Sequence, residues 1–215
     1  MDSDSPNEDL VSSRLAVVGR LTGHVVHDVN NALSPLVGKL QILRMQEIAD
    51  PENIAGDLEI MEQDSISASR RLQVLSQLSR DALIVEQPKP VVVSDCVREM
   101  EFLIGHHLQR RGIEVQPHMD SSMRAALACS IDTKLIIGGL MIATIKTTPS
   151  GGVFCIGSSG DMEDRVSLYL AVEGMDTEFI VPDELASLIR AVSPHTTVQV
   201  STKDSSRVTM SFQSA

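Results

Sequence analysis

The stretch LAVVGRLTGHVVHDVNNAL, residues 15–33, decides the fold. Its apolar positions recur in alternating steps of three and four residues, at Leu15, Val18, Thr22, Val25, Val29, Ala32 and Leu36. This heptad spacing predicts one face of a long amphipathic helix. Continuing the pattern beyond Pro35 requires a shift in phase, and the missing N–H of proline bends helices. We therefore expect one helix from about Asp9 to Ile48, kinked near Pro35.

A second helix is expected directly after the first. Asp50 can cap free N–H groups, and Pro51 is tolerated at the first helical position. The same three-and-four spacing then runs from Leu58 to Ala82. Two long helices joined by a short turn predict an antiparallel hairpin. Because one hairpin cannot bury an apolar stripe of this width, we expect two copies to pair into a homodimeric four-helix bundle.

The sequence changes character after Pro88-Lys89-Pro90, which indicates a hinge between two modules. Helical and strand-like segments mix beyond it and predict an α/β layer. We expect an acidic, disordered leader over 1–9, the hairpin over 10–87 and the α/β domain over 91–215. Within the α/β domain we expect a helix capped by Ser94 and ended by Gly112, strands at Ile113–Gln116, Val153–Gly157, Val166–Val172, Thr197–Ser201 and Val208–Phe212, and helices at Thr133–Thr147 and Pro182–Val192.

Composition limits the possible partners and location. The formal net charge is −11, and the chain has no Trp, one Tyr and four Phe. The negative charge and the scarcity of aromatic residues disfavour nucleic acid as a partner, because binding would need a basic surface and aromatic side chains on which bases stack. The longest apolar run, Leu135–Ile145, is too short to cross a bilayer. The cysteines at 96, 129 and 155 suggest no disulfide framework, so we expect a cytoplasmic protein with thiols in its core and no membrane contact.

The heptad numbering places His27 farthest from the apolar seam. Its imidazole should stand in solvent, where a second protein can reach it. Asn31 lies one turn later, His24 about one turn earlier, and Asp28 is adjacent, so these polar groups are expected to share one exposed patch. A neutral imidazole is a nucleophile near neutral pH, a carboxylate can hold the proton of its other nitrogen, and an amide can orient a phosphoryl oxygen or a water.

The same run resembles the phosphoacceptor box of sensor histidine kinases, in which a His is followed by an acidic residue and often by paired Asn. The resemblance implies that His27 carries a phosphoryl group, that Asp28 assists transfer and that Asn31 positions water for phosphatase activity. It also makes His24 and Asn30 candidates for partner binding. The family's usual proline five residues after the His is Ala32 here.

The α/β domain resembles a degenerate histidine-kinase ATPase sandwich. Aligned on the turn at 148–152, Gly139 and Ala143 stand where the family has an Asn that ligates ATP-bound magnesium. The adenine loop is altered to EGMDT, residues 173–177, and the glycine-rich lid before the last strands is missing. We expect neither a nucleotide nor a metal site in this chain. The histidines at 106, 107, 118 and 195 show no metal-ligand spacing either.

A phosphoacceptor bundle joined to a degenerate ATP domain is the arrangement of bacterial dimeric histidine phosphotransferases, and the second helix is similar to those of alphaproteobacterial members that accept from hybrid kinases. The resemblance implies a phosphorelay: His27 accepts from a receiver-domain aspartate and delivers to another response regulator, with magnesium supplied by the receiver. Alternatives are a phosphatase or binding regulator of a two-component system, and an ATP-dependent kinase with an unorthodox site. Whether the chain is an enzyme in its own right is left open, and autokinase activity is not expected.

Overall fold

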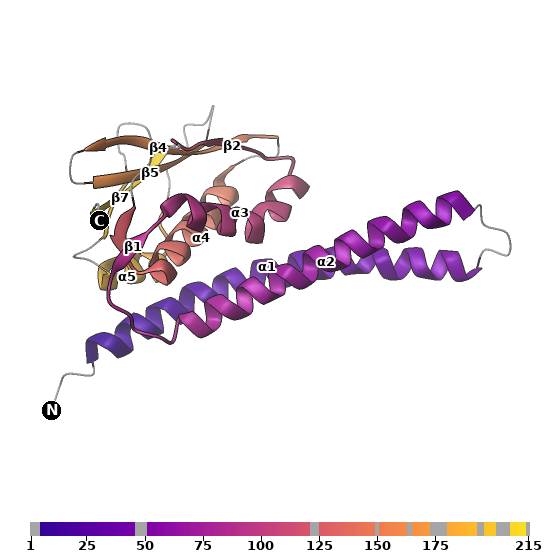
Figure 1. Ribbon diagram of the computed structural model, residues 1–215, viewed down its shortest axis with the longest axis horizontal. Coiled ribbons are helices and arrows are strands. Elements are labelled where there is room, and N and C mark those ends of the chain that lie inside the picture. Colours follow the sequence, from indigo (N-terminus) through magenta and orange to yellow (C-terminus); the bar gives the residue numbers. More distant parts are fainter. Residues whose placement is uncertain are drawn as a thin grey trace.

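The computed structural model describes residues 5–45, 51–120, 125–148, 151–162, 165–172, 180–192, 196–200 and 207–213. Its first part is an antiparallel hairpin of two long helices, α1 (Ser5–Met45) and α2 (Pro51–Asp81), as predicted (Figure 1). Residues 5–9 belong to α1, which corrects the expected leader over that span, while residues 1–4 lie outside the described residues. Pro35 lies inside α1, and the helix continues beyond it to Met45. Pro51 opens α2 as expected.

The hairpin is held together by the apolar seam. Val18, Val25, Val29 and Leu36 of α1 are buried, together with Met61, Ala68, Leu75 and Leu78 of α2. Near the far end of the hairpin, Lys39 Nζ lies 2.6 Å from Asp57 Oδ1 and links the two helices. Other members of the predicted seam, Leu15, Leu58 and Leu72, are exposed in the single chain. The hairpin therefore buries only part of its apolar stripe.

The second part is an α/β domain whose helices lie between its sheet and the hairpin (Figure 1). Its five-stranded sheet has the order β2-β4-β5-β7-β6, in which β2 pairs parallel with β4 and the other pairs are antiparallel. A second sheet pairs β1 with β3. The elements are β1 (Lys89–Val91), α3 (Val93–Arg110), β2 (Glu114–His118), β3 (Ala126–Ala128), α4 (Ser130–Thr147), β4 (Val153–Met162), β5 (Arg165–Val172), α5 (Asp183–Val192), β6 (Thr196–Val200) and β7 (Arg207–Gln213).

Two expectations about the ends of α3 had different outcomes. The predicted Ser94 cap is wrong, because the N-cap residue is Val92 and it makes no side-chain cap hydrogen bond. Ser94 instead lies in the first turn of the helix. Gly112 ends α3 as predicted: its φ is +67°, its N–H donates to Gln109 O, and the next N–H, of Ile113, donates to Leu108 O. Glycine adopts this left-handed backbone without steric cost.

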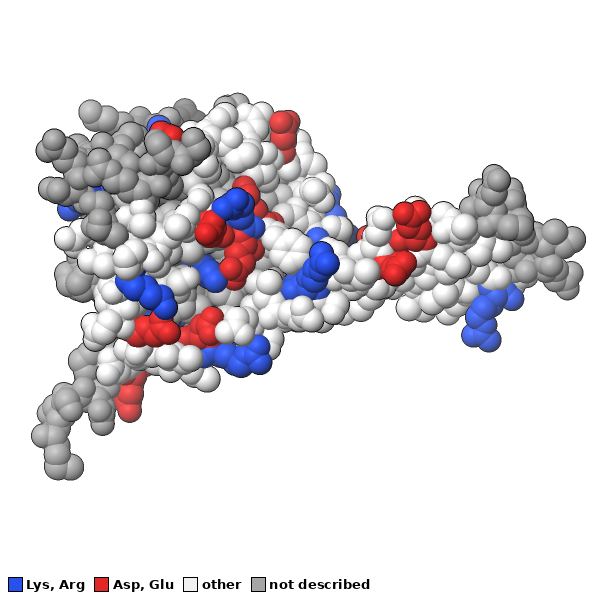
Figure 2. All heavy atoms as spheres, in the orientation of Figure 1, with Lys and Arg blue, Asp and Glu red and all other residues white. Residues whose placement is uncertain are grey.

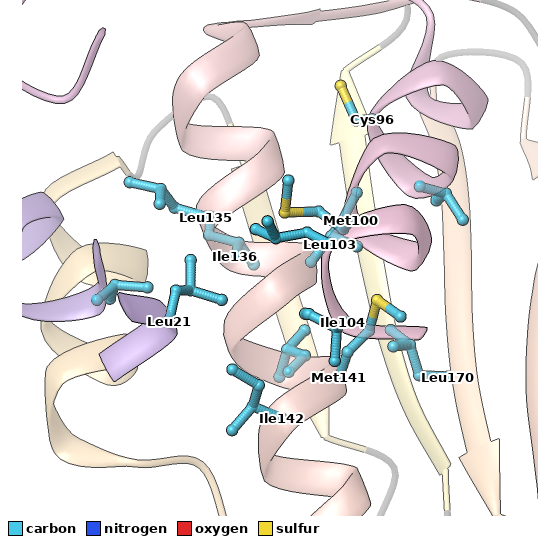
Figure 3. Packing of buried hydrophobic residues seen from close by; sticks show 14 of the residues in the cluster. Leu21, Cys96, Met100, Leu103, Ile104, Leu135, Ile136, Met141, Ile142 and Leu170 are labelled. Carbon is cyan, nitrogen blue, oxygen red and sulfur yellow. The ribbon is translucent and has the colours of Figure 1, made fainter. Parts of the chain in front are cut away.

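One core runs from the sheet through α3 and α4 into the hairpin. Along β5 the buried side chains Val166, Leu168, Leu170 and Val172 alternate, so one face of the sheet packs against the helices. Figure 3 shows Leu21 of α1 pointing toward α4, whose Leu135, Ile136 and Ile142 belong to the same buried cluster. Gly138 permits this approach, because a Cβ there would lie 3.2 Å from Leu21 Cδ2 as well as 2.9 Å from Met100 Sδ. The two parts of the chain therefore share their interior.

A buried ion pair fixes the hairpin to the α/β domain. Arg14 of α1 is fully buried; its Nε lies 2.6 Å from Asp132 Oδ1, and its Nη2 lies 2.8 Å from Asp132 Oδ2. Its third donor, Nη1, reaches the carbonyl of Ile84 at 2.7 Å. This bidentate contact joins α1, the first turn of α4 and the segment that follows α2.

The surface carries charges of both signs. On the face shown in Figure 2, acidic and basic side chains are interspersed, with no continuous basic surface among the described residues visible there. None of the described helices combines the length and apolar character that crossing a membrane requires.

Candidate functional site

His27 projects from the middle of α1 with 65% of its side chain exposed. The outward orientation predicted from the heptad numbering is therefore confirmed. The seam residues Val25 and Val29, two positions before and after it, are buried on the other side of the helix. Packing of these neighbours fixes the direction in which the imidazole points.

Asp28 corrects the sequence analysis, which expected its carboxylate in the exposed patch with His27. Its side chain is only 2% exposed, because α3 packs over it. His107 of α3 places Nδ1 3.3 Å from Asp28 Oδ1, and His27 Nδ1 lies 3.6 Å from the same oxygen. The carboxylate thus sits between two imidazoles, one exposed and one largely covered.

Asn31 lies one turn after His27 and contacts its ring, as the helical spacing predicted. Its Nδ2 is 2.9 Å from His27 Nδ1 and 3.2 Å from Nε2. The other amide of the pair, Asn30, is exposed, and its backbone carbonyl accepts a hydrogen bond from Ser34. Because an amide NH₂ only donates, the 2.9 Å contact directs the Nδ1 lone pair toward Asn31. A tautomer with its proton on Nδ1, toward Asp28, and a free lone pair on Nε2 requires the Asn31 amide to turn.

His24 lies partly covered beside the same site. Its ring meets that of His107 edge to face, with the ring centroids 5.3 Å apart. Burial lowers the pKa of His24, and the positive charge that His107 can carry lowers it further. The neutral form of His24 is therefore favoured.

Basic side chains act electrostatically on two histidines near the site, His24 and His106. The charges of Lys146 and Arg20 act on His24, and that of Arg71 from α2 acts on His106. Burial lowers the pKa of Arg71, while the charges of Asp28 and Asp64 raise it. Arg71 is therefore a basic side chain whose charge acts on Asp28, the neighbour of His27.

The face of α4 where a kinase would carry its cation ligand is apolar and packed. Gly139 and Ala143 are both buried. A Cβ at position 139 would come within 2.9 Å of Leu185 Cδ1 of α5, so an asparagine cannot be accommodated without displacing that leucine. The altered adenine loop at 173–177, the stretch 201–206 before the last strand and part of the turn at 148–152 lie outside the described residues.

His107 is the site residue that sequence reasoning missed. It is 79 positions from Asp28, and no spacing rule connects a residue of α3 with one of α1. Only the docking of α3 on α1 brings them together.

Comparison with solved structures assigns the fold. No protein-family model and no curated protein sequence matches the chain. The structure of the histidine kinase ThkA in complex with the response regulator TrrA superposes with a TM-score of 0.50 at 16% identity, covering 95% of this chain and 64% of that one. The chain has the fold of a histidine kinase core.

Two further solved histidine kinase structures superpose on parts of the chain. The nucleotide-free catalytic domain of ThkA covers 60% of this chain and 99% of its own, with a TM-score of 0.50 at 14% identity. The Acinetobacter baumannii histidine kinase AdeS covers 88% of this chain and 97% of its own, with a TM-score of 0.48 at 17% identity. The superpositions on ThkA confirm the predicted fold class, a helical hairpin followed by a kinase-type α/β domain.

Proposed function

We propose that this protein is a phosphorelay histidine phosphotransferase that carries a phosphoryl group on His27 and does not charge itself from ATP. The observation that carries the proposal is the position of the imidazole: it is 65% exposed on a helix, and its Nδ1 lies 3.6 Å from a buried carboxylate. The donor and the acceptor in this proposal are aspartates of response-regulator receiver domains, one of them in a hybrid kinase.

The transfer step needs only groups that the site and a receiver supply. The Nε2 lone pair attacks the phosphorus of the donor's aspartyl phosphate, the N–P bond forms, and the P–O bond breaks to release the donor carboxylate. Asp28, whose Oδ1 lies 3.6 Å from Nδ1, would close on a proton held there and stabilise the positive charge that develops on the ring. Asn31, 3.2 Å from Nε2, can orient a phosphoryl oxygen. Magnesium is expected on the receiver, and delivery to the next receiver is the same step reversed.

The packing around α4 supports transfer without ATP. Leu185 occupies the space that a side chain at position 139 would need. Ala143, one turn further along, has no atom that ligates a cation. A cation-ligating side chain at position 139 would have to displace the Leu185 side chain.

Unburied apolar side chains of the hairpin support the proposed homodimer. They include Leu33, Leu40, Leu58, Ile66 and Leu72, each between 40% and 48% exposed in the single chain. Leu33 and Leu40 lie one heptad apart, and Leu58 and Leu72 lie two heptads apart, so each of these two pairs lies on one helix face. A second copy of the hairpin would cover both faces and complete a four-helix bundle. Light scattering should then give twice the chain mass.

The test is transfer from a labelled receiver. A receiver domain carrying ³²P on its aspartate is mixed with the purified protein and magnesium, without ATP. Label should move to wild type and to the control His118→Gln, whose residue is exposed on β2, but not to His27→Gln. Labelling by ATP without any receiver would overturn the proposal in favour of a kinase.

The contact between Asn31 and His27 also favours a second candidate, a phosphatase. In that case the receiver would lose its label as inorganic phosphate without a labelled His27 accumulating. Asn31→Ala would stop the release. Stable label on His27 that chases into a second receiver would instead support the relay.

A further inference from the structure

The polar groups of α1 and α3 converge on one point beside His27. Among the residues that the structure describes, His27, Asp28 and His107 form a group whose possible ligand atoms all lie within 4.8 Å of one another. The three side chains offer two imidazole nitrogens and a carboxylate oxygen. Two of them are neighbours on α1, and the third comes from α3.

Two of the three separations are close to those between ligands of a tetrahedral metal ion, and the third, between the two imidazoles, is within 4.8 Å. With metal–ligand bonds of 2.0–2.1 Å, two ligand atoms of a tetrahedral zinc ion lie about 3.3 Å apart. Asp28 Oδ1 lies 3.3 Å from His107 Nδ1 and 3.6 Å from His27 Nδ1. An ion held by these atoms would displace the Asn31 amide, whose Nδ2 lies 2.9 Å from His27 Nδ1.

Asp28 is the most buried of the three proposed ligands. The Asp28 side chain is 2% exposed, that of His107 is 23% exposed and that of His27 is 65% exposed. A buried carboxylate needs a compensating charge, and a divalent cation held against it would provide one. The exposed side, at His27, leaves a path for entry and a fourth coordination position facing solvent.

From these contacts we propose that His27, Asp28 and His107 form a binding site for a divalent transition-metal ion, with zinc as the best fit. Two imidazoles and one carboxylate suit zinc and its first-row neighbours, whereas magnesium prefers six oxygen ligands. His24, whose ring centroid is 5.3 Å from that of His107, lies beside the site and holds the His107 ring edge to face.

Occupancy of this site would regulate His27. A metal bound through Nδ1 uses that lone pair, so the remaining ring proton must reside on Nε2. The nitrogen that would attack phosphorus then has no free lone pair, and metal binding and phosphoryl transfer exclude each other. This consequence rests on the proposed function, whereas the metal site itself rests on geometry alone.

Binding is tested on the full chain after treatment with a chelator. Zinc and magnesium are each titrated calorimetrically, and cobalt serves as the spectroscopic probe because four-coordinate cobalt absorbs strongly in the visible range. Zinc should bind one ion per chain, and cobalt should give the tetrahedral spectrum. His107→Ala and Asp28→Asn should each weaken zinc binding at least about tenfold. The control His118→Ala should bind as wild type does.

Two results would overturn the metal site. One is zinc affinity in His107→Ala equal to that of wild type, and the other is magnesium binding tighter than zinc. Circular dichroism of His107→Ala shows whether the fold is kept, and His107→Gln provides a second variant that keeps the side-chain volume closer to that of histidine.

The regulatory consequence is tested separately. Equimolar zinc should slow transfer to His27 in wild type, and transfer in His107→Ala should be insensitive to zinc. If His27 accepts no label under any condition, the proposed function fails while the cobalt spectrum still decides the metal site. If label moves at the same rate with zinc bound, the regulatory consequence is wrong.

Discussion

Replacing Arg14 by methionine should destabilise the whole chain, because this arginine neutralises a carboxylate buried between the two parts of the fold. The Arg14 side chain has 0% exposure and that of Asp132 has 4%, and their bidentate contacts are 2.6 and 2.8 Å long. The substitution leaves the carboxylate without its cation and the carbonyl of Ile84 without its 2.7 Å donor. Breaking a buried pair in this way costs about 3–5 kcal/mol.

The loss should appear as reduced global stability. Leu21 is fully buried in the core that α1 shares with α4, so the hairpin cannot separate without exposing it. With a denaturant dependence of about 2 kcal/mol per M urea, a loss of 3–5 kcal/mol lowers the unfolding midpoint by about 1.5–2.5 M. Helical circular dichroism during urea titration measures this midpoint.

A double-mutant cycle separates the ion pair from its surroundings. Arg14→Met combined with Asp132→Leu removes both charges and keeps apolar volume at the site, so the double variant should recover at least half of the loss of the single Arg14 variant. The reasoning would be refuted by a loss below about 1 kcal/mol for Arg14→Met, or by a double variant that loses the sum of the two single losses.

Three further outcomes are expected. Gly138→Ala should lower the free energy of unfolding in urea by about 1–3 kcal/mol, because the new methyl would lie 2.9 Å from Met100 Sδ. The control Gly56→Ala, on open helix surface, should raise it by up to about 1 kcal/mol. Equal unfolding midpoints for the two variants would contradict the packing around Gly138. Burial raises the pKa of Cys96 to about 11, so iodoacetamide at pH 8 should label it, by mass spectrometry, only after unfolding. Burial lowers the pKa of His24 below its unfolded value of 6.5, so the folded state binds fewer protons there and the free energy of unfolding should fall as the pH drops through 6.5. His24→Gln should flatten this pH dependence. An unchanged pH profile in that variant would contradict the burial of His24.

Local sequence patterns sufficed for the elements and for the direction of His27. The heptad spacing from Leu15 to Leu36 predicted a long helix, and the same spacing set the imidazole opposite the seam, since helix geometry fixes which positions share a face. Gly112 marked the end of α3 for an equally local reason, because the residue after a helix often needs a positive φ. The three-residue strand β3 was missed, since so short a segment carries no periodic pattern.

Tertiary packing decided what surrounds His27. The sequence placed Asp28 in an exposed patch, yet α3 covers it and brings His107 to within 3.3 Å, across 79 positions of the chain. Arg14 and Asp132, which lock the two parts together, are 118 positions apart. Helix periodicity relates residues a few positions apart and so determined that the hairpin exists and that His27 faces outward. The packing of one helix on another depends on how their whole apolar faces fit together, which is determined only in the folded chain.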